Sequence, residues 1–174
     1  MLEIPAGKYQ QDLKKIYRQF SAQELIYTQA KWMVYLKAAQ TGIANNVSTA
    51  VQWDALQFDC LGVGISQNYG FVCPFRGLYF VIVYLQYIDT LADHTYETRL
   101  YRDANRRRTM ARVRGEGQAK YVGDAAGTII EGARGQELIA HGFHQDGTAN
   151  PGIDGGWVAK SNMTVHLLSR VCPT

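Results

Sequence analysis

Apolar side chains occupy both faces of one stretch of the chain, residues 77–87. In an extended strand, successive side chains point to opposite sides. One face would carry Leu78, Phe80, Ile82 and Tyr84, and the other Tyr79, Val81, Val83, Leu85 and Tyr87. β-Branched and aromatic residues dominate, which favours a strand over a buried helix. The run is also shorter than the roughly 20 residues of a membrane-spanning helix. The pattern therefore predicts a long central strand that is covered on both sides.

Two layers must cover such a strand. One is the second layer of the domain itself, and the other is either a set of helices over a parallel sheet or a neighbouring subunit. After residue 45 the chain shows several strand patterns and no regular alternation with helices, which favours the neighbouring subunit. Burying each large apolar side chain contributes about 1.5 to 3 kcal/mol, so a solvent-exposed apolar face of this size would favour association with another protein surface. We therefore expect a homo-oligomer.

Short strand patterns separated by turn signals continue from residue 31 to the end of the chain. Further strands are predicted at residues 32–36, 49–60, 65–73, 95–101, 110–113, 127–131, 137–143 and 157–169. Pro74 and Gly77 form the turn into the central strand, and the glycine-rich residues 146–156 are expected to form a surface loop. This spacing predicts an all-β antiparallel sandwich, most simply a jelly roll, over residues 31–174.

Residues 1–30 have a different pattern from the rest of the chain. Leu13, Ile16, Tyr17 and Phe20 fall on one helical stripe, and residues 21–24, Ser-Ala-Gln-Glu, have the form of a capping box. The pattern predicts a short N-terminal helical arm. The arm either packs on its own domain or docks on another protein or on the symmetry axis of its own oligomer.

Composition bears on the compartment in which the chain is made and on the classes of partner it binds. The 174 residues carry a formal charge of +3, which does not argue for nucleic acid or membrane partners. The arginine run at residues 106–108 has no aromatic platform beside it, which favours a solvated hairpin tip over a phosphate site. Three cysteines at unrelated spacings indicate reduced thiols. The first residues lack the pattern of a signal peptide, so synthesis in a cytoplasm is expected.

The segments around the central strand carry a series of motifs. Phe71-Val-Cys-Pro74 closes a short strand, and Gly77, Tyr79 and Phe80 open the long one. A strand with Trp53-Asp54 and Phe58-Asp59 comes before them. Leu100-Tyr101 begins a later turn, and Glu131 to Glu137 leads into another strand. In this order, residues 31–171 resemble the complement C1q and tumour necrosis factor superfamily.

The resemblance implies a ten-stranded jelly roll that assembles as a tight homotrimer. By position, the side chains that face the threefold axis would be Leu78, Phe80, Ile82 and Tyr84, with Met163 from the final strand. That strand reads Met163-Thr-Val165 where the family usually shows Phe-x-Gly. A collagen-like Gly-x-y stalk is absent from the sequence, so the animal extracellular roles are not expected here.

Similar domains occur in viral, phage and bacterial proteins, as trimeric decoration proteins or receptor-binding tips. The function we expect is therefore that of a structural virion protein, a homotrimeric decoration or cement protein of a bacteriophage head, made in the host cytoplasm. Its partners would be its own copies and the major capsid protein or another virion protein, held through Leu13, Ile16, Tyr17 and Phe20. The alternative is the receptor-binding tip of a viral tail fibre, with loops at residues 106–108 and 146–156 contacting the host surface.

Candidate catalytic groups are few. His141, His144 and Asp146 are potential metal ligands, but on a strand His141 and His144 point to opposite faces. Asp54 and Asp59 would likewise face opposite sides, and Ser66 lacks the Gly-x-Ser-x-Gly elbow. No enzyme activity, cofactor or metal is therefore expected. A third reading, a small hydrolase or metal-dependent enzyme, would require a pocket that gathers His141, His144 and an acid.

Overall fold

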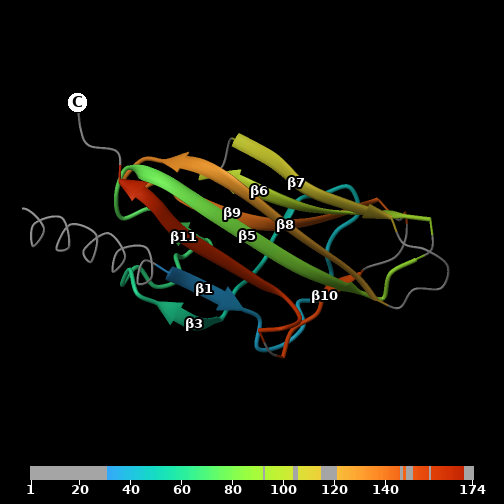
Figure 1. Ribbon diagram of the computed structural model, residues 1–174. Coiled ribbons are helices and arrows are strands. Elements are labelled where there is room, and N and C mark those ends of the chain that lie inside the picture. The colour runs from blue at the N-terminus through green and yellow to red at the C-terminus, as the bar shows by residue number, and fades with distance from the viewer. Residues whose placement is uncertain are drawn as a thin grey trace, which may run out of the picture.

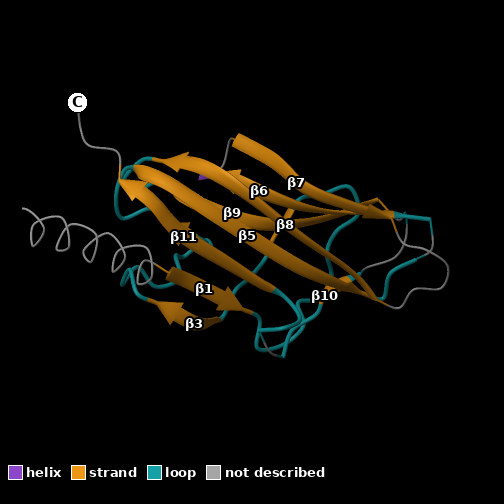
Figure 2. Cartoon of the chain, in the orientation of Figure 1, coloured by secondary structure: helices purple, strands orange, loops and turns teal. Residues whose placement is uncertain are grey.

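Two antiparallel sheets stacked face to face form the part of the chain that the structure describes (Figure 1). The structure is a computed structural model, and it describes residues 31–91, 93–103, 106–114, 121–145, 147, 151–156 and 158–170. The arm predicted over residues 1–30 lies outside these residues. Every extended element among the described residues is a strand, and none is an α-helix (Figure 2). The predicted all-β antiparallel sandwich is confirmed.

The strands divide between the sheets as follows. Sheet A has the order β8 (Tyr121–Gly132), β5 (Gly77–Ile88), β11 (Asn162–Arg170), β1 (Lys31–Tyr35) and β3 (Ala55–Asp59), with β10 (Gly152–Ile153) beside the end of β5. Sheet B has the order β2 (Thr49–Ala50), β9 (Glu137–Gln145), β6 (Thr95–Arg102) and β7 (Arg106–Arg114), with β4 (Phe71–Val72) also paired to β9.

The predicted central strand is β5, which lies between β8 and β11 in sheet A (Figure 1). Its inward side chains, Tyr79, Val81, Val83, Leu85 and Tyr87, are all 0% exposed. They pack against sheet B in a core whose largest members are Trp32, Trp53, Tyr79, Tyr87, Tyr96 and Phe71. The Phe71 ring lies 5.3 Å from the Trp32 ring and 5.6 Å from the Tyr79 ring. One apolar face of the strand is thus covered by the domain's own second layer.

Three predicted segments differ from the structure. The strand predicted at residues 49–60 divides into β2 of sheet B and β3 of sheet A, because the chain crosses the core at Val51 and Trp53, both buried. The strand predicted at residues 65–73 is reduced to β4. Residues 66–70 form a turn instead, in which Ser66 N–H donates to the Gly70 carbonyl (3.1 Å).

The expected surface loop at residues 146–156 is wrong for residues 151–155, which are buried. Ile153 is 0% exposed, and β10 pairs with the end of β5 at Tyr87 and Ile88. Glycine permits this course, because a Cβ on Gly155 would lie 2.2 Å from the Ala38 carbonyl oxygen. The final strand correspondingly begins at Asn162 rather than at residue 157.

The placement of Met163 beside the axis-facing residues of β5 is also wrong. Met163 is 0% exposed and pairs with Val83, whose side chain points into the core. Its neighbours Thr164 and His166 occupy the outward face, opposite Ile82 and Phe80. Alternation along a strand fixes this result, since a shift of one residue moves a side chain to the other face.

The thiols that the structure describes are unpaired, as predicted for Cys60 and Cys73. Cys60 is exposed and Cys73 is buried in the core. Burial raises the pKa of the Cys73 thiol to about 12. Cys73 therefore behaves as a small apolar core residue.

Candidate functional site

The outward face of sheet A carries large apolar side chains that the domain itself leaves uncovered. We call it the outward apolar face; its members are Leu78, Phe80, Ile82 and Tyr84 on β5, Ile129 on β8, Met33 on β1 and Phe58 on β3. Leu78 is 38% exposed, Phe58 47% and Ile129 55%. The four β5 residues predicted for this face lie on it. That copies of the chain cover it stays a prediction.

Small residues on β8 keep this face flat. Gly127 pairs with Ile82, and a Cβ on Gly127 would lie 3.0 Å from the Phe80 ring. Gly123 lies in the same way beneath Tyr84: a Cβ on Gly123 would lie 2.7 Å from the Tyr84 hydroxyl oxygen. The rings of Phe80 and Tyr84 therefore lie over the backbone of β8, and a flat aromatic surface of this kind allows another protein to approach closely.

A histidine, His166 of β11, lies opposite Phe80 on the outward apolar face. Its ring centroid is 6.5 Å from that of Phe80. Partial burial, with a smaller contribution from Lys31, lowers the pKa of His166 below its usual 6.5. On sheet B, burial likewise lowers the pKa of His141, and the charge of Arg99 acts in the same direction. Both imidazoles are neutral at pH 7.

These two histidines predict a loss of stability at mildly acidic pH. Their folded-state pKa values are depressed, so the unfolded chain binds more protons, and the free energy of unfolding falls as pH drops from 6.5 towards 5. Most carboxylates titrate below that window. Urea unfolding at pH 7 and pH 5 should show this decrease in the free energy of unfolding. The decrease should be smaller in H141Q and in H166Q than in the wild type. An unchanged pH dependence in both variants would contradict the assignment.

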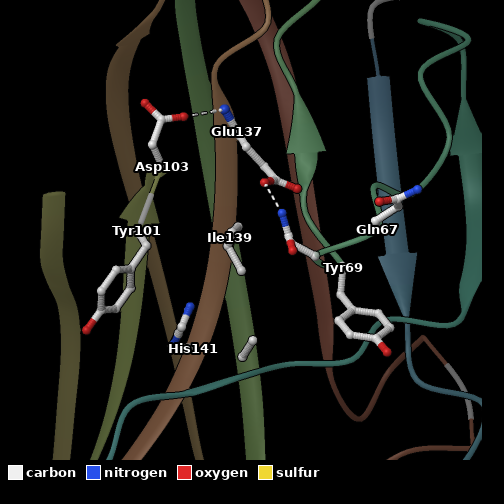
Figure 3. Close-up of a pocket in the computed structure, with 9 residues that line it drawn as sticks. Gln67, Tyr69, Tyr101, Asp103, Glu137, Ile139 and His141 are labelled. Atoms are coloured by element: carbon white, nitrogen blue, oxygen red, sulfur yellow. Dashed lines mark hydrogen bonds between the residues drawn. The ribbon is translucent and has the colours of Figure 1, made fainter. Parts of the chain in front are cut away.

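A pocket of about 400 Å³ opens on the outward face of sheet B, on the opposite side of the sandwich. We call it the Tyr69–Tyr101 pocket; it is lined by Ala50, Gln67, Asn68, Tyr69, Tyr101, Asp103, Glu137, Ile139 and His141. Figure 3 shows Tyr101 and Tyr69 on opposite sides, with Ile139 and His141 between them. Ile139 is 8% exposed and forms an apolar floor.

The pocket owes its shape to the turn at residues 66–70, which is bound to the start of β9. The Ser66 hydroxyl and the Asn68 amide (2.9 Å) both donate to the Glu137 carboxylate. Gly70 packs directly on β9, because a Cβ there would meet the Leu138 carbonyl oxygen at 2.7 Å. Tyr69 takes a backbone φ of 63°, which is uncommon for a bulky residue; the turn holds it there, since the Tyr69 N–H donates to the Ser66 carbonyl at 3.0 Å.

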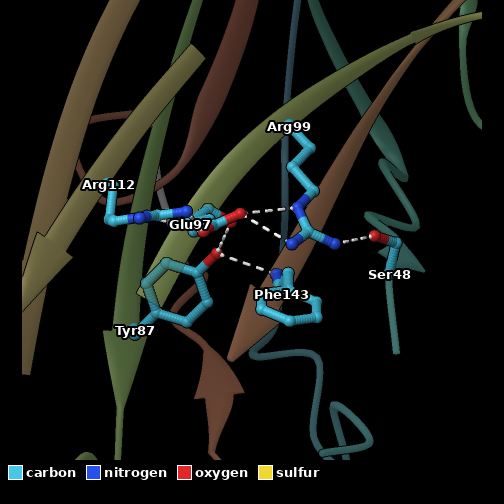
Figure 4. A network of polar contacts seen from close by, with 6 residues as sticks. All are labelled: Ser48, Tyr87, Glu97, Arg99, Arg112 and Phe143. Carbon is cyan, nitrogen blue, oxygen red and sulfur yellow. Dashed lines mark hydrogen bonds and ion pairs between the residues drawn. The ribbon is translucent and has the colours of Figure 1, made fainter. Parts of the chain in front are cut away.

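Further along the same face lies a buried ion cluster (Figure 4). The Glu97 side chain is 3% exposed and lies between two arginines: Arg99 Nε and Arg112 Nε each donate to it at 2.7 Å. The Arg99 guanidinium covers the Phe143 ring, 3.3 Å from its centroid, and donates to the Ser48 hydroxyl at 2.5 Å. The cluster ties β6, β7, β9 and the segment before β2 together.

The two histidines considered as metal ligands point to opposite faces of β9, as predicted. His141 stacks on Tyr101 with ring centroids 4.1 Å apart, whereas the buried His144 lies 2.5 Å from the Ile43 carbonyl oxygen and stacks on Tyr96. Within the described residues, no group of three His, Cys, Asp or Glu side chains is placed to hold a metal. Asp146 and the side chains of residues 106–108 lie outside the described part.

Asp54, just before β3, and Asp59, at its end, have structural roles. Asp54 accepts the backbone N–H of Lys37 at 2.7 Å. Asp59 accepts those of Val63 and Gly64 at 3.1 and 2.8 Å. They do not share a site. None of the described residues forms a helix of the length and hydrophobicity needed to cross a bilayer.

The chain has a C1q/TNF-like jelly-roll fold, which rests on its similarity to two solved structures. Among solved structures, Eiger TNF from S. frugiperda is 10% identical in sequence and has a TM-score of 0.59. The match covers 82% of this chain and 94% of the Eiger chain. The globular domain of zebrafish complement 1qA protein is also 10% identical, covers 82% of this chain and 99% of its own, and has a TM-score of 0.58. Neither a protein-family model nor a curated protein matches the chain.

Sequence reasoning missed the Tyr69–Tyr101 pocket. Its side chains come from four separate segments that only the pairing of β9 with β2, β4 and β6 brings together. One local signal was present in the sequence: Ser66-Gln-Asn-Tyr-Gly70 is rich in turn-forming residues and interrupts a strand pattern.

Proposed function

We propose that the chain assembles as a homotrimer through the outward apolar face of sheet A. The observation that carries this proposal is the exposure of Leu78, Phe58 and Ile129 beside the half-buried Phe80 and Ile82. Contiguous apolar patches on soluble proteins mark interaction sites, and each large side chain removed from water contributes about 1.5 to 3 kcal/mol. The resemblance to the C1q and tumour necrosis factor superfamily favours threefold symmetry for the assembly.

We infer that this trimer is a structural virion protein that decorates or cements a capsid. Two features support the role. Similar domains occur as trimeric decoration proteins, and residues 1–30 join the domain at Lys31, which begins β1 of sheet A and pairs with His166. The arm predicted from Leu13, Ile16, Tyr17 and Phe20 would thus leave the trimer beside its buried face and bind a neighbouring capsid protein. The proposal includes no catalytic step and no cofactor.

Deletion of residues 1–30 tests this role. The shortened chain is expected to remain a soluble trimer, because sheet A forms the trimer interface. It should no longer bind the particle, because the arm supplies the attachment. Quantitative mass spectrometry of purified particles, with the full chain as reference, measures the occupancy. Full occupancy by the shortened chain would exclude the arm as the anchor.

A second candidate is the receptor-binding tip of a viral tail fibre. The Tyr69–Tyr101 pocket favours it, because a pocket on sheet B would face outward when sheet A is buried at the trimer axis. The number of copies per particle separates the two functions. Hundreds of copies indicate a shell protein, whereas a few indicate the tail.

A further inference from the structure

The Tyr69–Tyr101 pocket is independent of the proposed trimer interface. Its walls come from the outward face of β6 and β9 in sheet B, whereas the outward apolar face belongs to sheet A. Covering sheet A with other copies would therefore leave the pocket open. The pocket combines aromatic rings, an apolar floor and an acidic side chain, which restricts the ligands it can accept.

The charge of the pocket favours a cation. Glu137 lines it, and the hydrogen-bond donors on its carboxylate, the Ser66 hydroxyl and the Asn68 amide, carry no charge. Among the described residues that line the pocket, none is a lysine or an arginine. The remaining titratable base, His141, is neutral at pH 7, because burial lowers its pKa. An anionic ligand would meet the Glu137 carboxylate, and no described lining residue is a lysine or arginine that could bind the anion.

The aromatic rings favour a particular class of cation. The Tyr101 ring is held against the His141 imidazole, with centroids 4.1 Å apart and planes at 31°. Tyr69 stands on the opposite side, and Ile139 lies between them (Figure 3). Aromatic faces attract cations through the ring quadrupole, and quaternary ammonium groups are recognised in this way because they are weakly hydrated. A strongly hydrated primary ammonium would lose more on leaving water.

We propose that this pocket binds a compact quaternary ammonium group, held between Tyr69 and Tyr101 over Ile139, with the Glu137 carboxylate as its counter-charge. The volume of about 400 Å³ is ample for a trimethylammonium group and the chain that bears it. Two sources share this chemistry, a choline-type headgroup and a trimethylated lysine.

A titration with choline and its neutral carbon isostere, 3,3-dimethyl-1-butanol, tests the proposal on the full chain. Chemical shifts of the protein should saturate with choline, and the isostere should bind at least about tenfold more weakly because it lacks the charge. A separate titration with trimethyllysine distinguishes the two sources, because the ligand that binds more tightly indicates which source the pocket accepts. Binding of either ligand requires the quaternary ammonium site.

Variants assign the binding to this pocket. E137Q and Y101L should each weaken choline binding about tenfold. D93N is the matched control for charge: Asp93 is 83% exposed and pairs with Arg114 away from the pocket, so its affinity should match that of the wild type. Circular dichroism checks that E137Q, which leaves one acceptor oxygen in place of the two that bind Ser66 and Asn68, is folded. Y101L leaves that turn intact.

Three results would overturn the proposal. The first is the absence of saturation with both choline and trimethyllysine up to about 20 mM. The second is equal affinity for choline and its neutral isostere, which would reduce the site to an apolar one. The third is tighter binding of methyl glucoside than of choline, which would make the pocket a carbohydrate site. None of these results bears on the trimer, whose mass is measured separately.

Discussion

I82D is expected to convert the assembled protein into single chains. Ile82 lies in the middle of the outward apolar face, between Gly127 of β8 and Thr164 of β11. At a threefold interface the substitution would bury three carboxylates near one another, at a cost of several kcal/mol for each. Because the side chain points away from the core, the fold of the single chain should survive. Light scattering coupled to gel filtration measures the change in mass.

The matched control for I82D is T109D on β7 of sheet B. Thr109 is exposed, so a carboxylate there should leave the mass of the assembly unchanged. Circular dichroism of both variants should match that of the wild type. An I82D protein that keeps the wild-type assembled mass would contradict the assignment of the outward apolar face as the interface.

E97A is expected to cause the largest loss of folding stability. Its carboxylate, 3% exposed, is the partner of the Arg99 guanidinium, which is itself only 7% exposed. Removing one member of a buried ion pair leaves the other charge uncompensated and costs about 3 to 5 kcal/mol. Urea unfolding at a fixed protein concentration measures the difference, since assembly contributes to apparent stability.

R112Q provides the comparison for E97A. The Arg112 side chain is 68% exposed although its guanidinium reaches Glu97, and its removal leaves the Arg99–Glu97 pair intact. The expected loss is about 1 kcal/mol or less. Equal losses for E97A and R112Q would mean that the burial of Arg99 does not determine the stability of this cluster.

Strand alternation and the resemblance predicted different parts of the fold. The two faces of β5 follow from residues 77–87 alone, because every second side chain is apolar on both sides. Met163 is a residue for which the resemblance gave the wrong face. Met163, Val165 and Leu167 alternate with Thr164 and His166 and are buried, so the period of two already placed Met163 inward. Carrying a family position onto it moved it to the wrong face.

The sites on sheet B depend on strand order, which the local pattern does not contain. Glu137 and Tyr69 meet because β4 pairs with β9, and Tyr101 joins them because β6 pairs with the other edge of β9. The buried Glu97 and Arg99 read as polar positions of an ordinary half-exposed strand. They are covered because the segment at Ser48 and the ring of Phe143 pack over them.

The mass of the purified full chain in solution is the most direct test of the central claim, that sister copies bury the outward apolar face of sheet A. Multi-angle light scattering on the wild-type protein should give three times the chain mass of 19.5 kDa, unchanged on dilution to about 1 μM. A mass of a single chain over the whole concentration range, with Phe80 and Ile82 left in water, would contradict the trimer and the structural role proposed for it.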